Sequence, residues 1–331
     1  MKYHYKIKSN MNLYIPETRK LYVIGNGFDK HHGMKCGYCD FKEWLKSNRK
    51  NVYENLIRIY GNLTDDWWSK FEESLSDFDP DQFPSEVAGA TFFEYLRKLE
   101  KRYGKEGRSF IDKYEMENKT ISNRLNRAAA IADFEMGHLK NDLCKAFGDW
   151  VKEIKIPDAS KRDCDLDTTA LFFTFNYTRT LEDLYNIEED QVIHLHGSVD
   201  NGVFVIGHNM SAEEMLERDL GRHVYDRDPN DDNGEDAARI AMFEVAEDLK
   251  KPVYDIIREH SADFNSLGDI EELEVLGFSY SQIDQPYLER IFEETGKEIK
   301  IILGWHDKTD RVNAETFAHK MELSNYELLQ F

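Results

Sequence analysis

The chain of 331 residues lacks any apolar run that approaches the roughly 20 residues a membrane-spanning helix needs. Its first 20 residues, MKYHYKIKSNMNLYIPETRK, are basic and lack the apolar core of a secretory signal peptide. Only four cysteines occur, which is too few for a disulfide scaffold and typical of a reduced intracellular protein. We therefore expect a cytoplasmic protein with no membrane partner.

A recognisable metal-binding pattern is also lacking. Cys36 and Cys39 form a C-x-x-C pair, but Cys144 and Cys164 do not form the second pair that a four-cysteine zinc site would need. The histidines of the HLHG segment likewise have no further ligands at a recognisable spacing. No metal is expected from these patterns.

Positive charge is in short supply. The 43 Lys and Arg residues face 64 Asp and Glu residues, which gives a formal net charge of −21. Such a charge repels polyanions and disfavours nucleic acid as a partner, although a local basic groove can persist, best supplied by residues 97–108. In contrast, 40% of the residues are hydrophobic and 13% aromatic, which is enough to bury a sizeable core.

The hydrophobic pattern changes period along the chain. Residues 41–150 show long helical periodicity without a convincing strand, and we interpret them as a helical insertion or lid. Apolar strand-like runs lie on both sides of it and alternate with helical stretches, at residues 20–29, 169–178, 191–197, 203–208, 273–279 and 300–303. This alternation predicts an α/β core from residues 1–40 and 151–331, with a mostly parallel sheet.

The first of these strands runs into Gly25-Asn26-Gly27-Phe28-Asp29. Glycines after a strand let the backbone approach a phosphate, and the amides of a following helix favour an anion. The dinucleotide-binding fingerprint G-x-G-x-x-G requires a third glycine at position 30, which is Lys30 here, so the fingerprint is incomplete in this chain. A plain strand-to-helix turn is the alternative.

Three further strand ends carry polar residues. Asn176 follows the apolar run ALFFTF, where it could face a ligand crevice or cap a helix that begins near Thr180. Strand alternation places His194 and His196 on one face, and His196, beside a glycine, suits a general base or a structural role. Gly277 and Ser279 form another such turn, in which Ser279 or Ser281 could also cap the next helix.

The order of these segments, GNGFDKHHG, TFNYT, HLHG and LGFS, resembles the abortive-infection AbiH family of bacterial anti-phage proteins. The resemblance runs from about Leu21 to Leu303 and includes W-x-x-F-E-x-x-L at Trp68–Leu75 and F-x-x-W at Phe147–Trp150. That family is in turn similar to sirtuin-like proteins, which implies a Rossmann-like NAD-binding fold. It also implies a phage-defence effector that cleaves NAD at the nicotinamide–ribose bond.

The sirtuin-like resemblance also implies residue roles. His196 matches the catalytic histidine, and Asn176 matches the asparagine that positions the ribose and a water. The cofactor-binding positions that it implies, together with the residues beside them, are Gly25, Asn26, Gly27, Asp29, Phe41, Thr178, Gly277 and Ser279. Asn26 and Thr178 depart from the pattern, because sirtuin-like proteins usually carry a small residue and an aspartate there. Asp29 and Glu72 are weaker candidates for stabilising positive charge.

Two other functions remain open at this point. A nuclease or other phosphate-ester hydrolase would use His196 with Asp29 or Glu72 and a divalent metal. A non-catalytic nucleotide-sensing module would bind its ligand without turnover. The NAD-hydrolysis hypothesis and the sensing hypothesis both predict a nucleotide as partner. A phage-derived trigger and a second copy of the chain in a homo-oligomer are further hypotheses about partners.

Overall fold

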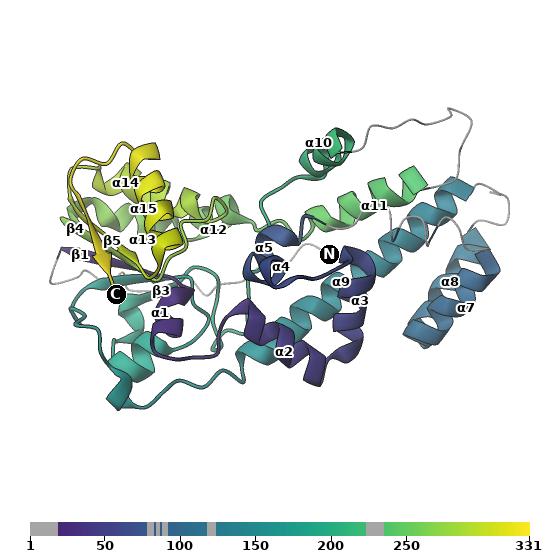
Figure 1. Ribbon diagram of the computed structural model, residues 1–331, viewed down its shortest axis with the longest axis horizontal. Coiled ribbons are helices and arrows are strands. Elements are labelled where there is room, and N and C mark those ends of the chain that lie inside the picture. The colour runs from purple at the N-terminus through teal and green to yellow at the C-terminus, as the bar shows by residue number, and fades with distance from the viewer. Residues whose placement is uncertain (1–18, 78–82, 84–86, 88–91, 118–123, 223–234) are drawn as a thin grey trace. The chain divides into compact units, whose positions relative to one another are not determined.

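The computed structural model, drawn in Figure 1, describes residues 19–77, 83, 87, 92–117, 124–222 and 235–331. The N-terminal segment without a signal-peptide pattern lies mostly outside these residues. By its internal contacts the chain divides into two units. One comprises residues 1–41, 147–206 and 251–331, and the other comprises residues 42–146 and 207–250. The second unit thus joins the expected helical segment to a later part of the chain.

A parallel sheet of six strands forms the centre of the first unit in the described part of the chain. Its order is β3-β2-β1-β4-β5-β6, and every neighbouring pair is parallel. The strands are β1 (Lys20–Ile24), β2 (Leu171–Thr174), β3 (Val192–His194), β4 (Glu272–Leu276), β5 (Lys300–Trp305) and β6 (Tyr326–Gln330). The chain builds outward from β1 in one direction and then from β4 in the other. This is the strand order of Rossmann-like folds, and it confirms the predicted fold class.

The sheet is buried on both faces because alternate residues of its strands enter two separate cores. Leu21 and Val23 of β1 belong to one core, and Tyr22 and Ile24 belong to the other. Helices α12 (Val253–Glu259), α13 (Ser261–Asn265), α14 (Gln285–Thr295) and α15 (Lys308–Lys320) and the 3-10 turn η4 (Ser266–Asp269) pack on the first core. Helix α1 (Asn26–His31) and the π-helical turn η2 (Thr180–Leu184) pack on the second. Burial on both faces explains why most positions of β1 and β2 are apolar, while Lys20 of β1 pairs with Glu272 and Glu274 of β4.

Two details of the predicted strands are wrong. Residues 203–208 form no strand, and Val205 donates its amide to the carbonyl of His196 in a loop closure instead. Strand β6 was not predicted, since its residues alternate between partly exposed and exposed at the edge of the sheet. The short 3-10 turns η1 (Ala159–Lys161) and η3 (Glu189–Gln191) precede β2 and β3.

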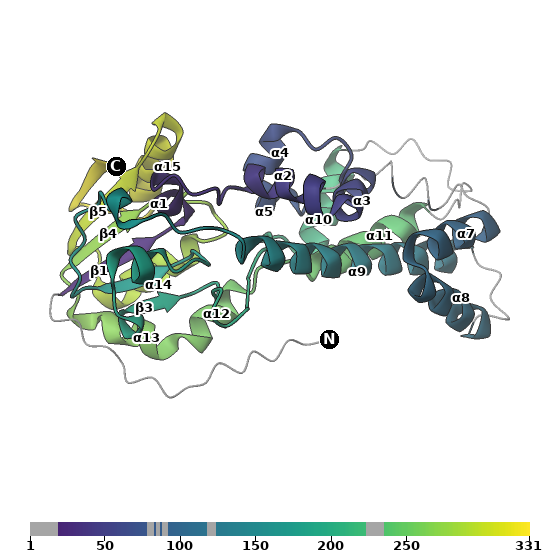
Figure 2. The same cartoon turned by 90° about the horizontal axis from the view of Figure 1, so that it is seen from below.

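The described residues of the second unit are mainly helical, and an isolated parallel bridge joins His208 to Lys250. Its helices are α3 (Lys50–Tyr60), α4 (Asp65–Ser69), α5 (Phe71–Ser74), α7 (Phe92–Tyr103), α8 (Lys105–Glu117), α10 (Ala212–Arg222) and α11 (Glu235–Glu247). Helices α2 (Tyr38–Asn48) and α9 (Arg124–Val151) belong mostly to it, and Figure 2 shows the length of α9. No described helix is long and apolar enough to cross a lipid bilayer.

A buried carboxylate connects three helices of this unit. Glu135 of α9 is fully buried and pairs with Arg58 of α3 and Arg102 of α7, each at 2.5 Å. Tyr103 also donates its hydroxyl to this carboxylate. Because a buried charge is tolerated only when paired, this cluster is a specific connection between α3, α7 and α9.

Candidate functional site

The two glycine turns pack directly against each other at the carboxyl ends of β1 and β4. Gly25 donates its amide to Leu276 O at 2.9 Å, and Gly27 donates to Gly277 O at 2.8 Å. A Cβ atom at Gly25 or Gly27 would lie 2.5 or 2.7 Å from backbone atoms of Gly277. The turns therefore share one edge of the sheet, next to the point where the strand order reverses.

This packing accounts for the glycines without a ligand. The amides of Gly25 and Gly27 are already used by the β4 turn, and α1 has only six residues. The neighbouring Asn26 has a structural partner too, because its Nδ2 donates to Cys36 O at 3.0 Å. The contact between the two turns therefore explains the glycines, and phosphate binding by Gly25 and Gly27 stays a prediction.

Asp29 of α1 meets the segment that follows β2. Its side chain is buried, and its Oδ2 accepts a hydrogen bond from Thr178 Oγ1 at 2.5 Å. Burial raises the pKa of Asp29. The hydroxyls of Thr178 and Thr180 and the side-chain amide of Asn176 oppose this shift, because they favour the ionised carboxylate. The other oxygen, Oδ1, is buried without a hydrogen-bond partner in the described part of the chain.

Asn176 lies two residues beyond the end of β2. Its amide donates to Thr174 Oγ1 at 3.1 Å, and its side-chain Oδ1 is buried with no hydrogen-bond partner among the described residues. The alternative role as a helix cap is wrong, because the turn η2 begins after Arg179 and has no side-chain cap. Asn176 is therefore a buried carboxamide with an unused acceptor.

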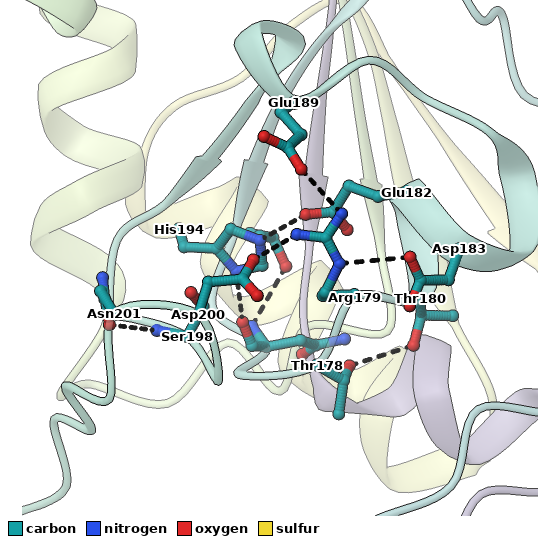
Figure 3. A network of polar contacts seen from close by, with 12 residues as sticks. Thr178, Arg179, Thr180, Glu182, Asp183, Glu189, His194, Ser198, Asp200 and Asn201 are labelled. Carbon is teal, nitrogen blue, oxygen red and sulfur yellow. Dashed lines mark hydrogen bonds and ion pairs between the residues drawn. The ribbon is translucent and has the colours of Figure 1, made fainter. Parts of the chain in front are cut away.

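His194 supports this segment from β3. Its Nδ1 lies 2.9 Å from Asn176 O, and its Nε2 lies 3.0 Å from Glu182 Oε1 (Figure 3). In the same network Arg179 binds three carboxylates, those of Asp183, Glu189 and Asp200. His194 thus positions the backbone of Asn176 and is not an inert neighbour of His196.

His196 lies just beyond β3, which ends at His194, so the strand alternation does not reach it. Its ring packs between Phe175 and Tyr287, with centroids 4.9 and 5.5 Å away, and the residue is only 2% exposed. Burial and the nearby Lys251 hold the pKa of His196 well below its ordinary value. The imidazole is therefore neutral at physiological pH, and its Nε2 has no hydrogen-bond partner within the described chain.

A buried ion pair flanks this imidazole. Asp284, the residue before α14, places Oδ1 3.6 Å from His196 Nε2 and 3.2 Å from Lys251 Nζ. The Lys251 side chain is 1% exposed and that of Asp284 13%. Sequence reasoning predicted neither Asp284 nor Lys251 as a site residue. The sequence shows Lys251 only as a lysine shortly before the apolar start of a helix. Such a position does not indicate which residue the lysine pairs with.

Two other predicted site residues, Phe41 and Ser279, have partners elsewhere. Phe41 is fully buried, with ring centroids 5.3 Å from Phe147 and 5.1 Å from Trp150, so the F-x-x-W motif is part of its packing. Ser279 Oγ accepts from the Ser281 amide at 3.4 Å and does not cap α14, which has no side-chain cap.

Glu72 of α5 belongs to the helical unit. Its Oε1 accepts from the Gly207 amide at 3.3 Å, which ties the two segments of that unit together. This oxygen of Glu72 therefore has a structural partner, and a role of Glu72 in stabilising positive charge stays a prediction.

The sheet order defines a Rossmann-like α/β protein, and the candidate site residues Asp29, Asn176 and His196 follow the ends of β1, β2 and β3. Residues 21–305 match the family described as bacteriophage abortive infection AbiH, and the chain belongs to that family. Its role is thus in abortive infection by bacteriophage. No curated protein and no solved structure matches the chain.

Proposed function

We propose that this protein is an abortive-infection effector that hydrolyses NAD at the nicotinamide–ribose bond. The observation that carries the proposal is that three buried polar atoms beyond the carboxyl ends of the strands have no hydrogen-bond partners among the described residues. These are Asp29 Oδ1, Asn176 Oδ1 and His196 Nε2, each just beyond a different parallel strand. Buried polar atoms are nearly always paired, so such a group at a sheet's carboxyl edge favours a polar ligand.

These residues suit the chemistry of glycosidic bond cleavage. The bond to nicotinamide breaks as positive charge develops on the ribose, so catalysis depends on positioning and electrostatics more than on a strong nucleophile. Neutral His196 would take a proton from the attacking water and pass it to solvent. The Asn176 carboxamide would accept a hydrogen bond from that water or from a ribose hydroxyl.

The departure at Thr178 is compatible with this proposal. Sirtuin-like proteins usually carry an aspartate at that position, and here the Thr178 hydroxyl instead donates to Asp29 at 2.5 Å. A carboxyl group is thus present beside Thr178, supplied by α1. The proposal rests on Asp29, Asn176 and His196 and not on the glycine turn, whose amides at Gly25 and Gly27 are occupied.

The test is incubation of the purified full chain with NAD, with and without phage lysate, followed by chromatography of nicotinamide and ADP-ribose. Because His196 is only 2% exposed, NAD can enter only after a rearrangement at this edge, and the lysate supplies an activating condition. We expect His196→Ala to lower the rate by about 10²–10⁴-fold.

The matched control is His306→Ala, which removes an exposed imidazole of the same unit and should leave the rate unchanged. Circular dichroism establishes that both variants are folded. Binding of NAD without release of nicotinamide under either condition would overturn the proposal in favour of the sensing module. Cleavage of a phosphate ester that chelation abolishes would favour the hydrolase instead.

A further inference from the structure

A second group of chemically reactive side chains lies outside the residues used above. His31, the last residue of α1, places Nε2 3.2 Å from Asp163 Oδ2. Cys164 follows directly and places Sγ 3.8 Å from Asp163 Oδ1. One donor atom from each of these residues lies within 4.8 Å of the others. We propose that His31, Asp163 and Cys164 bind a zinc ion.

The spacing of the donor atoms suits such an ion. With zinc–ligand bonds of about 2.0–2.3 Å, neighbouring ligands of a tetrahedral site lie roughly 3.3–3.8 Å apart. The separations from Asp163 Oδ2 to His31 Nε2, 3.2 Å, and from Asp163 Oδ1 to Cys164 Sγ, 3.8 Å, are close to this range and involve both carboxylate oxygens. A small rotation of the Cys164 side chain brings the third pair, now within 4.8 Å, to the same spacing.

The donor set selects the metal. An imidazole nitrogen and a sulfur are ligands that zinc prefers, whereas magnesium and calcium take oxygen ligands almost exclusively. Burial raises the pKa of Cys164, so the thiol is protonated before binding, and the ion must displace this proton into solvent as the Zn–S bond forms. The net charge of −21 favours the approach of a cation.

A second layer of contacts holds the ligands in place. His32 is buried, with Nδ1 2.7 Å from Phe28 O and Nε2 3.3 Å from Asp163 Oδ1. The Tyr185 hydroxyl lies 2.6 Å from the same Nε2 and accepts the Cys164 amide at 3.1 Å. Partners of this kind orient metal ligands, so the carboxylate and the cysteine backbone are already fixed before an ion arrives.

The site is open to solvent on one side. The His31 side chain is 25% exposed and that of Asp163 56%, which gives an ion access from solution. Three protein ligands leave a fourth position for water. Such an ion would tie the end of α1, which carries Asp29, to the loop before β2.

The test is a titration of the chelator-stripped full chain with Co²⁺, a spectroscopic substitute for zinc. We expect one equivalent to produce the charge-transfer absorption of a Co²⁺–thiolate bond, and Zn²⁺ to remove it. Cys164→Ala should lose this absorption. The matched control Cys39→Ala, which removes an exposed cysteine of the same unit, should keep it.

A second measurement needs no variant. In the wild-type chain Zn²⁺ should slow alkylation of Cys164, mapped by mass spectrometry, at least about tenfold, because the metal-bound thiolate is blocked. Alkylation of Cys39 should be unchanged. Equal alkylation of Cys164 with and without Zn²⁺, or a charge-transfer band that persists in Cys164→Ala, would overturn the proposal. Neither result depends on NAD cleavage.

Discussion

Gly277 adopts a backbone conformation with φ +65°, and a Cβ atom there would lie 2.0 Å from the Phe28 amide nitrogen. Its substitution therefore faces both backbone strain and a clash with the α1 turn. The contact joins the two strand ends at which the sheet order reverses. Only glycine, which has no side chain beyond a hydrogen atom, allows the two turns to pack together at this position.

We predict that Gly277→Ala lowers the free energy of unfolding by about 2–5 kcal/mol, from left-handed strain plus overpacking. The matched control is Gly296→Ala, at φ +74° with nothing within 4 Å of the added Cβ. It should cost only the strain of this backbone conformation (ψ 174°), about 1–3 kcal/mol. Urea unfolding of both variants measures the difference, and equal losses would contradict the turn-packing account.

His208 supplies a residue-scale prediction about pH. It is fully buried, with Nε2 2.9 Å from Ala246 O and Nδ1 accepting the Met210 amide at 3.1 Å. Burial lowers its pKa to about 4. Because the unfolded histidine titrates near about 6.5, only the unfolded chain gains this proton as the pH falls from about 6.5 to about 4.

The contribution of His208 to stability is therefore present above pH about 6.5 and falls by up to about 3 kcal/mol as the pH approaches about 4. We predict that His208→Gln flattens this part of the stability profile. Unfolding of wild type and variant at about pH 7 and about pH 4.5 measures the change. Parallel pH profiles would show that His208 is not the group responsible.

At the scale of elements, the Lys251–Asp284 pair connects the residues just before α12 and α14. Removing the cation alone leaves a mostly buried carboxylate without this partner. We predict that Lys251→Met costs about 3–5 kcal/mol of unfolding free energy. The double variant Lys251→Met with Asp284→Leu should recover much of that loss, since neither charge remains buried.

A double-mutant cycle with thermal or urea unfolding measures this coupling. If the double variant were as unstable as the sum of the two single variants, the pair would not act as a unit. The pKa of His196 gives an independent readout of the Lys251 charge. Because that charge lowers the pKa of His196, Lys251→Met should raise it.

The same scale shows what the sequence could predict of the fold. The apolar runs of β1, β2, β4 and β5 identified buried parallel strands, because a strand covered on both faces is apolar throughout. Strand β6 was missed since its edge position leaves Glu327 and Leu329 exposed. Residues 203–208 have an apolar strand pattern but do not pair with a strand of the sheet. The local sequence pattern does not distinguish such a segment from a true strand.

At the scale of the whole molecule, the candidate site is a tertiary product. Motif reasoning identified Asp29, Asn176 and His196, each of which follows a recognisable strand. It did not identify Lys251 beside His196. His31 with Asp163 and Cys164 was missed for the same reason, because these contacts arise only when distant segments meet. Contacts between residues that lie far apart in the sequence produce no periodic sequence pattern by which they could be predicted.

The most direct test of the central claim is the NAD content of phage-challenged bacteria that express equal amounts of wild type, His196→Ala or His306→Ala. With wild type and His306→Ala, we predict a fall in NAD after infection and reduced phage plating. With His196→Ala, NAD should stay at the uninfected level and phage should plate normally. Protection by wild type with an unchanged NAD pool, or full protection by His196→Ala, would contradict the account.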